Sequence, residues 1–253
     1  MVAATRGQQG WADKSGGRVD LALTLPVFLG YHLGVVFLKV KNGSDPVTGP
    51  LLELASGSRD AYLGLTIAIG VLFAAIFALA SRGQAFRIEK FAQIAVEGVV
   101  YAVAMRLGAD YVVGRLSVAL GPAPSPLAHP DVGTGVVMSM GAGFYEELAF
   151  RVVLFGLGAK ALVWLFVQED VGLVERGSRL SFKAVLLMLG WAVASAAIFS
   201  GVHYIGVYGD KLELSSFLFR MVLGLALTLI FVTRGFAAAV WAHAFYDIWV
   251  LVL

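Results

Sequence analysis

Long apolar runs separated by short polar connections dominate the chain. Crossing the hydrocarbon core of a bilayer takes a helix of about 20 mostly apolar residues. The segments that we expect to span a membrane are 21–40, 61–80, 94–120, 136–167, 184–204, 217–233 and 236–253. The pattern therefore predicts an all-α fold, a polytopic transmembrane helical bundle of seven to eight spans.

The number of spans is seven or eight because the segment 136–167 can form one crossing or two. Its roughly 32 residues would measure about 48 Å as a helix, which is too long for one upright crossing. We expect it to tilt, to break near Gly156-Leu157-Gly158, or to extend beyond the bilayer. We divide the chain into a polar flexible tail, residues 1–20, and a single membrane domain, residues 21–253.

Composition narrows the function classes. Hydrophobic residues make up 59% of the chain and charged residues only 14%, against about 25% charged in soluble domains. A net charge of +2 without a long basic run gives no support for a nucleic-acid partner. The absence of cysteine excludes disulfides, Cys-ligated zinc and thiol nucleophiles. The lipid bilayer is the expected environment.

Ionisable side chains inside apolar spans are costly and mark candidate functional sites. Glu146 and Glu147 are adjacent, so their side chains point about 100° apart on a helix and are expected to serve different purposes. Glu147 and Arg151 are four residues apart in the order that favours an ion pair. Glu146 then lacks a partner on its own helix, which suits a general base. The alternative is a structural network of all three residues.

Two histidines extend this candidate site. His203 ends the span 184–204 in the sequence Phe199-Ser200-Gly201-Val202-His203. His243 and Asp247 are four residues apart in the last span, so they share one helical face and can act on one atom. The alternatives are a packing role for His203 and a simple hydrogen bond between His243 and Asp247.

The order Glu-Glu-x-x-x-Arg, Phe-x-x-x-His and His-x-x-x-Asp within 144–247 resembles the CAAX prenyl protease and bacteriocin-processing family of glutamic-type intramembrane endopeptidases. The resemblance implies that Glu146 activates a water molecule with help from His203. It also implies that Glu147 and Arg151 support the site.

In the same family the last motif, here His243 and Asp247, is expected to stabilise the oxyanion of the tetrahedral intermediate. Many relatives carry Asn where this chain carries Asp247. An ionised carboxylate cannot donate a hydrogen bond, so Asp247 must be protonated, orient His243, or bind another group.

A zinc ion is the alternative for the same residues. Glu146, His203, His243 and Asp247 form a nitrogen and oxygen set that zinc accepts. The family resemblance favours a metal-free glutamate mechanism, and we expect no cofactor.

The leading functional hypothesis is therefore an endopeptidase that acts on a membrane-anchored protein or peptide. A prenylated tail, a bacteriocin leader and a C-terminal sorting tail of an exported protein all fit the family. A non-proteolytic membrane scaffold or immunity protein is the second hypothesis. A proton-coupled transporter is the third, and the absence of an internal repeat counts against it.

The remaining polar residues have weaker interpretations. His32 in the first span is interpreted as structural, and His129 as a surface residue between two prolines. Arg106 and Asp110, four residues apart, are expected to pair. Glu97 is considered as a residue that lines a water-filled cavity.

Basic residues near the span ends predict the topology, since they are enriched on the cytoplasmic side. With 136–167 counted as one crossing, ten fall on the side of the N terminus: Arg6, Lys14, Arg18, Arg82, Arg87, Lys90, Arg176, Arg179, Lys183 and Arg234. The opposite side has four: Lys41, Arg59, Arg115 and Lys211. We therefore expect a bacterial inner-membrane protein with a cytoplasmic N terminus.

Overall fold

The described part of the chain is a bundle of helices without strands. The computed structural model describes residues 17–80, 89–120, 130–169, 180–206 and 209–253. The elements are α1 (Gly17–Leu38), α2 (Thr48–Leu54), α3 (Arg59–Ala80), α4 (Glu89–Leu120), α5 (Val132–Glu146), the π-helix η1 (Glu147–Leu157), α6 (Gly158–Val167), α7 (Phe182–Val202), α8 (Leu214–Arg234) and α9 (Phe236–Val252). The predicted fold class, an all-α helical bundle, is confirmed.

Five stretches of the described chain are long and apolar enough to cross a membrane. They are Asp20–Leu38, Glu89–Val112, Val132–Val167, Phe182–Val202 and Leu214–Arg234. The last helix, Phe236–Val252, is apolar but shorter. Each of these lies where the hydropathy pattern places a span.

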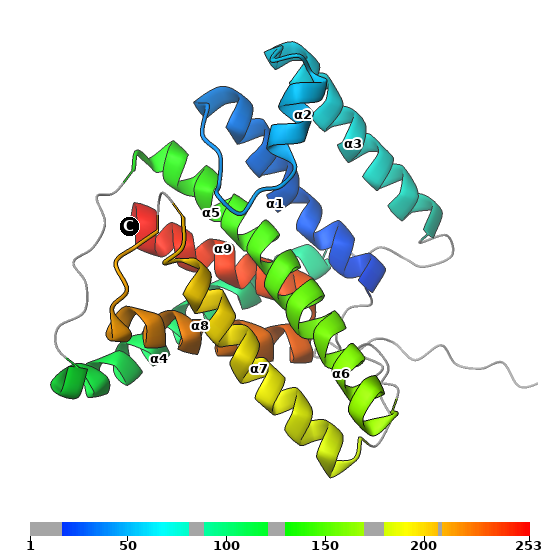
Figure 1. The fold of residues 1–253 in the computed structure, drawn as a ribbon. Coiled ribbons are helices and arrows are strands. Elements are labelled where there is room, and N and C mark those ends of the chain that lie inside the picture. The colour runs from blue at the N-terminus through cyan, green and yellow to red at the C-terminus, as the bar shows by residue number, and fades with distance from the viewer. Residues whose placement is uncertain (1–16, 81–88, 121–129, 170–179, 207–208) are drawn as a thin grey trace, which may run out of the picture.

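The longest of these stretches, Val132–Val167, is one continuous helix. Figure 1 shows α5 and α6 in green as a single rod. Of the outcomes expected for this segment, the break at Gly156-Leu157-Gly158 does not occur. The helix instead widens to a π-helix over Glu147–Leu157 and returns to the α form at Gly158. The segment is therefore one passage through the bundle.

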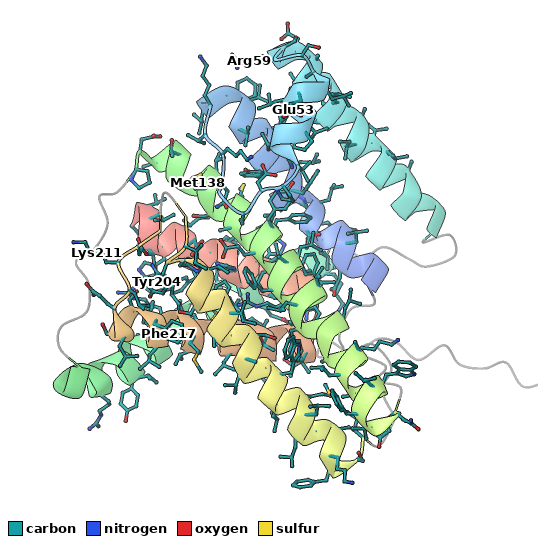
Figure 2. The ribbon with its side chains drawn as sticks, in the orientation of Figure 1. Glu53, Arg59, Met138, Tyr204, Lys211 and Phe217 are labelled. Carbon is teal, nitrogen blue, oxygen red and sulfur yellow. The ribbon has the colours of Figure 1, made fainter. Side chains whose placement is uncertain are left out.

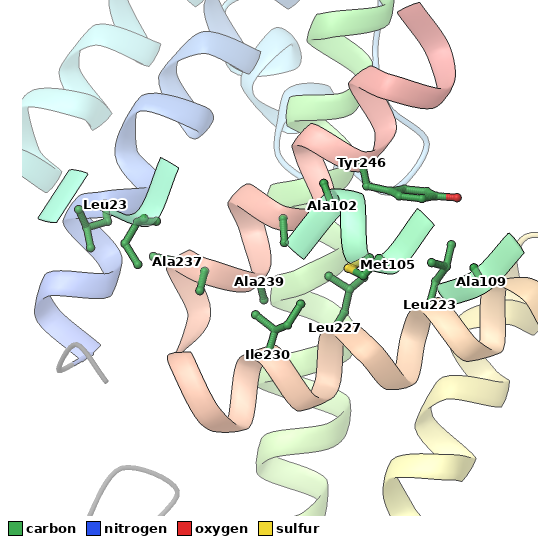
Figure 3. Close-up of a cluster of buried hydrophobic side chains, with 13 residues drawn as sticks. Leu23, Ala102, Met105, Ala109, Leu223, Leu227, Ile230, Ala237, Ala239 and Tyr246 are labelled. Carbon is green, nitrogen blue, oxygen red and sulfur yellow. The ribbon is translucent and has the colours of Figure 1, made fainter. Parts of the chain in front are cut away.

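The last helix lies at the centre of the bundle. It packs against α5, α4, α8 and α1 (Figure 1). Small side chains let neighbouring helices approach closely, and the buried face of α9 is rich in alanine. These alanines of α9 and residues of α1, α4 and α8 form one hydrophobic cluster (Figure 3). It includes Leu23, Met105, Leu223, Leu227, Ile230, Ala237, Ala238, Ala239 and Ala242.

A tight corner joins α8 to α9 and ties both to the first helix. Gly235 has a φ of 104°, which a residue with a side chain rarely adopts. The backbone N–H of Phe236 donates to the Asp20 carboxylate at 2.8 Å, which satisfies one free amide at the start of α9. Asp20 is buried in the first turn of α1. The last four residues of the expected tail, 17–20, are thus helical.

Candidate active site

The site forms where α5 crosses α9. A Cβ built at Gly143 would lie 2.9 Å from the Cβ of Ala244 and 2.9 Å from the carbonyl oxygen of Val240. Only glycine permits this separation. The close crossing brings the residues one turn further along α5 beside His243 of α9.

Glu147 links two other residues of the candidate site. Its Oε2 lies 3.1 Å from Nε of Arg151, so the predicted ion pair is present. Its Oε1 accepts a hydrogen bond from Nδ1 of His243 at 2.7 Å. The guanidinium of Arg151 also lies 4.3 Å from the centre of the Phe199 ring. Glu147 and Arg151 are both fully buried, so this cluster holds η1, α7 and α9 together.

Glu146 faces two imidazoles across gaps too long for direct hydrogen bonds. Its Oε2 lies 3.9 Å from Nε2 of His203 and 3.9 Å from Nε2 of His243. The adjacent glutamates therefore both approach His243, at different ring nitrogens. A contact longer than about 3.5 Å between polar atoms leaves room for a bridging water.

The backbone fixes the orientation of the His203 ring. Nδ1 of His203 lies 2.8 Å from the carbonyl oxygen of Phe199, which can only accept a hydrogen bond. Nδ1 therefore carries the proton, and in the neutral ring Nε2 presents a lone pair towards Glu146. His203 follows the last residue of α7, so its position depends on where that helix ends.

Asp247 completes the group from α9. Its Oδ2 lies 3.5 Å from Nε2 of His243, as the four-residue spacing predicts. The His243 ring is thus approached by three carboxylates: Glu147 at Nδ1, and Glu146 and Asp247 at Nε2. Since Glu147 accepts from Nδ1, the other ring nitrogen is the one left for a ligand.

These side chains border a cavity of about 690 Å³. Glu146, His203, His243 and Asp247 all line it. The remaining walls come from α4, α8 and α9 and include apolar side chains such as Met105, Phe219 and Leu223. The structure therefore brings the four predicted catalytic residues to one chamber with mixed polar and apolar walls.

A polar cluster beside His203 escaped the sequence analysis. Figure 2 shows Tyr204 and Phe217 where the end of α7 meets the start of α8. Arg220 of α8 donates to Asp210 at 2.5 Å and to the hydroxyl of Tyr204 at 3.0 Å. The backbone N–H of Asp210 in turn donates to the carbonyl oxygen of His203 at 2.9 Å. Arg220 thereby holds the turn that follows His203.

The other ion pairs test the weaker predictions. Arg106 and Asp110 pair at 3.0 Å, as expected. Glu97 pairs with Arg234 at 2.6 Å and is absent from the cavity lining, so its interpretation as a cavity residue is wrong. The error arises because Arg234 lies far away in sequence, at the end of α8. His129 lies outside the described residues.

His32 belongs to a second histidine cluster. Its ring lies between the hydroxyls of Tyr62, at 2.8 Å, and Tyr145, at 2.6 Å. Tyr31 of the same helix donates to Asp45 at 2.7 Å. His32, Tyr31 and Tyr62 are almost completely buried. These contacts agree with the structural interpretation of His32.

The zinc alternative would use Glu146, His203, His243 and Asp247, the same residues that lie together here. Over the described ranges, no group of three or more His, Asp or Glu side chains is placed to hold a metal ion.

Comparison with known proteins identifies the region that carries the site. Residues 129–249 match the family model described as "Type II CAAX prenyl endopeptidase Rce1-like". This region, just under half of the chain, is similar to the Rce1-like family. The match confirms the resemblance seen in the three motifs and covers all six candidate residues. No curated protein and no solved structure gives a significant match. Together with this match, the five long apolar helices support an integral membrane protein.

Proposed function

We propose that the protein is an intramembrane endopeptidase that hydrolyses a peptide bond in a membrane-anchored protein or peptide. The observation that carries the proposal is the gap between Glu146 and His203. A carboxylate oxygen and an imidazole lone pair lie 3.9 Å apart at the wall of a 690 Å³ cavity. Two acceptors at this separation suit a water molecule that donates one hydrogen to each.

In the proposed reaction, this water attacks the carbonyl carbon of the scissile peptide bond. Glu146 takes the proton from the water as its oxygen forms the new bond, which is general base catalysis. The tetrahedral intermediate then collapses, the C–N bond breaks, and Glu146 returns the proton to the leaving amine. The products are a new carboxylate and a new amine.

His243 is the proposed partner of the oxyanion. Glu147 holds its Nδ1–H at 2.7 Å, and Nε2 points towards Glu146 and Asp247. To donate from Nε2 while Nδ1–H is held by Glu147, the ring must carry both protons. We propose that Asp247 orients this imidazolium. Preorganised donors of this kind act on charge that develops during the reaction.

We propose a mechanism without a metal ion or other cofactor. Each step described above is performed by a carboxylate, an imidazole or water. Dialysis of the purified protein against a strong chelator should therefore leave the rate of cleavage unchanged. Loss of activity on dialysis, with recovery on addition of zinc, would contradict the metal-free mechanism.

We also propose that the N terminus is cytoplasmic, in a bacterial inner membrane. With one passage over 132–167, the basic residues divide as in the sequence analysis, and the His203 end of α7 lies towards the outer face. Such a site suits exported proteins with a C-terminal sorting tail. A cysteine at Gly43 should react with an impermeant reagent from outside, and one at Leu180 should not. The reverse pattern would invert the topology.

The direct test of the function is cleavage by the purified protein in nanodiscs. The substrates are three anchored peptides: a prenylated tail, a leader peptide and a tail with one apolar helix and a basic end. Mass spectrometry should find a new C terminus with the parent protein and none with Glu146→Gln. Intact substrates in every case would favour the non-proteolytic alternative.

A further inference from the structure

A second pocket, separate from the cavity at Glu146, lies between α1, α2 and α3. Its volume is about 260 Å³. The walls are mainly apolar and include Val35, Val36 and Leu52. Thr48 and Tyr62 form its polar base, with their hydroxyl oxygens 3.3 Å apart. Its lining residues all lie outside residues 129–249, and none of them lines the cavity at Glu146, so the pocket is separate from the proposed peptidase site.

Three cations surround this pocket. Lys39, Lys41 and Arg59 belong to its lining, and all three are exposed. The lining contains no carboxylate; the neighbouring Glu53 and Asp60 are exposed and lie outside it. Figure 2 shows Arg59 and Glu53 at the tip formed by α2 and α3. The lining thus carries three cations, while the buried Asp45 lies behind the base and accepts from the backbone N–H of Thr48 at 3.0 Å.

The three cations differ from the arginines of the core helices. Arg106, Arg151, Arg220 and Arg234 each have a carboxylate within ion-pair distance. Within the described ranges, Lys39, Lys41 and Arg59 have no ion-pair partner. Unpaired positive charges gathered around one apolar pocket attract an anionic ligand from outside the chain.

Local structure directs these cations. Lys39 has a φ of 56°, a left-handed conformation that is uncommon for a residue with a side chain. It ends α1 and turns the chain towards α2. The Arg59 guanidinium lies 4.9 Å from the centre of the Phe37 ring. A Cβ built at Gly49 would lie 3.5 Å from Nζ of Lys41, so that ammonium lies over the start of α2.

The surroundings of the pocket identify the kind of anion. It lies where the spanning helix α1 ends and α3 begins, and Phe37 and Leu54 beside it are 62% and 70% exposed. Exposed aromatic and aliphatic side chains next to cations are typical of the membrane interface. An occupant therefore needs a negative head for the cations and an apolar body for the walls.

We propose that this pocket binds one anionic phospholipid. The phosphate lies among Lys39, Lys41 and Arg59, and the first part of an acyl chain lies against Val35, Val36 and Leu52. Each basic residue near an anionic lipid contributes favourably to binding. The site fixes one lipid at the turn between α1 and α3.

Native mass spectrometry of the detergent-solubilised protein tests the proposal. The full chain is extracted from nanodiscs that contain equal amounts of phosphatidylglycerol and phosphatidylcholine. One phosphatidylglycerol should remain bound under conditions that remove phosphatidylcholine. The triple variant Lys39→Gln, Lys41→Gln and Arg59→Gln should bind phosphatidylglycerol about 100-fold more weakly.

Two control variants make the result decisive. Lys90→Gln, Lys183→Gln and Lys211→Gln together remove the same charge elsewhere and should retain the lipid. Lys39→Arg, Lys41→Arg and Arg59→Lys together keep the charge in the pocket and should also retain it. Equal retention of both lipids by the parent protein, or an unchanged affinity in the first triple variant, would overturn the proposal. Displacement of the bound phosphatidylglycerol by glycerol 3-phosphate alone would identify a soluble anion as the ligand and overturn the proposal of a phospholipid.

Discussion

Two adjacent residues of α5, Tyr145 and Glu146, face two different histidine clusters. The clusters differ in how closely their polar groups approach one another. Tyr145 contacts His32, whose ring is held between two hydroxyls at 2.6 Å and 2.8 Å. Glu146 faces His203 and His243 at 3.9 Å, beside a cavity. The first cluster has short contacts, and neither His32 nor Tyr145 lines either of the two cavities described above. In the second cluster, the distance between Glu146 and each imidazole leaves room for one water molecule.

The difference shows how to distinguish a structural histidine from a candidate catalytic one. Both clusters contain buried polar groups that must find partners. The His32 cluster satisfies both ring nitrogens within the protein, so nothing is left to bind a ligand. The His203 and His243 rings each bind the protein through Nδ1 and leave Nε2 at the cavity. A ring nitrogen that faces a cavity, rather than the presence of a histidine alone, marks a candidate catalytic residue.

Among the histidine variants, the largest expected effect comes from His203. His203→Gln should lower kcat by roughly 10²–10⁴-fold, because the water loses the nitrogen that orients it. The matched change in the other cluster, His32→Gln, should leave kcat near the parent value. Peptide cleavage in nanodiscs measures both. A fall in kcat of the same size for the two variants would remove the distinction between the clusters.

Next in size is the buried pair beneath the site. Glu147→Gln or Arg151→Leu should lower the free energy of unfolding by about 3–5 kcal/mol, because each leaves a buried charge without its partner. Arg106→Leu, at a partly exposed pair, should cost about 1 kcal/mol or less. Denaturation in detergent micelles gives these values. If Glu147→Gln were inactive but as stable as the parent, the roles of the two glutamates would be reversed.

The turn after His203 should have a smaller effect, and one on rate rather than stability. Arg220→Ala should lower kcat by about 10–100-fold, since a small displacement of His203 misplaces the water. The exchange Arg220→Asp with Asp210→Arg should recover part of the loss. Arg234→Ala removes an ion pair away from the cavity and should leave kcat unchanged. No recovery in the double variant would argue against positioning through Asp210.

The smallest effect is expected at the one departure from the family pattern. Asp247→Asn should cleave at about the parent rate or faster, because the amide oxygen can still accept from Nε2–H of His243 and the amide NH2 can donate to the oxyanion. Kinetics and elemental analysis of the same preparation check this. An inactive variant that has also lost a stoichiometric metal would contradict the metal-free mechanism.

Much of the helical framework follows from local sequence. The spans are long apolar runs, so hydropathy predicts their positions. The Glu147–Arg151 and Arg106–Asp110 pairs follow from four-residue spacing on one helix. The spacing of His243 and Asp247 likewise predicts a shared face, and the two are 3.5 Å apart.

Contacts between distant segments could not be predicted in this way. The partners of His32 lie 30 and 113 residues away, and Glu97 meets Arg234 across 137 residues. These pairs depend on which helices approach one another, and the approach depends on small residues such as Gly143 that hydropathy does not weigh. The π-helix at Glu147 and the Arg220 cluster have no signal in apolar periodicity. An arginine inside the apolar helix α8 was nevertheless a sign that a polar partner would be found.

The most direct test of the central claim compares the two adjacent residues of α5. Glu146→Gln and Tyr145→Phe are each measured for kcat and for the free energy of unfolding in one preparation. Glu146→Gln should abolish cleavage and keep the parent stability, because it alters the group that activates water. Tyr145→Phe should lose about 1–3 kcal/mol of stability and keep the parent kcat, because it removes a buried hydrogen bond. Cleavage by Glu146→Gln at the parent rate would contradict the account.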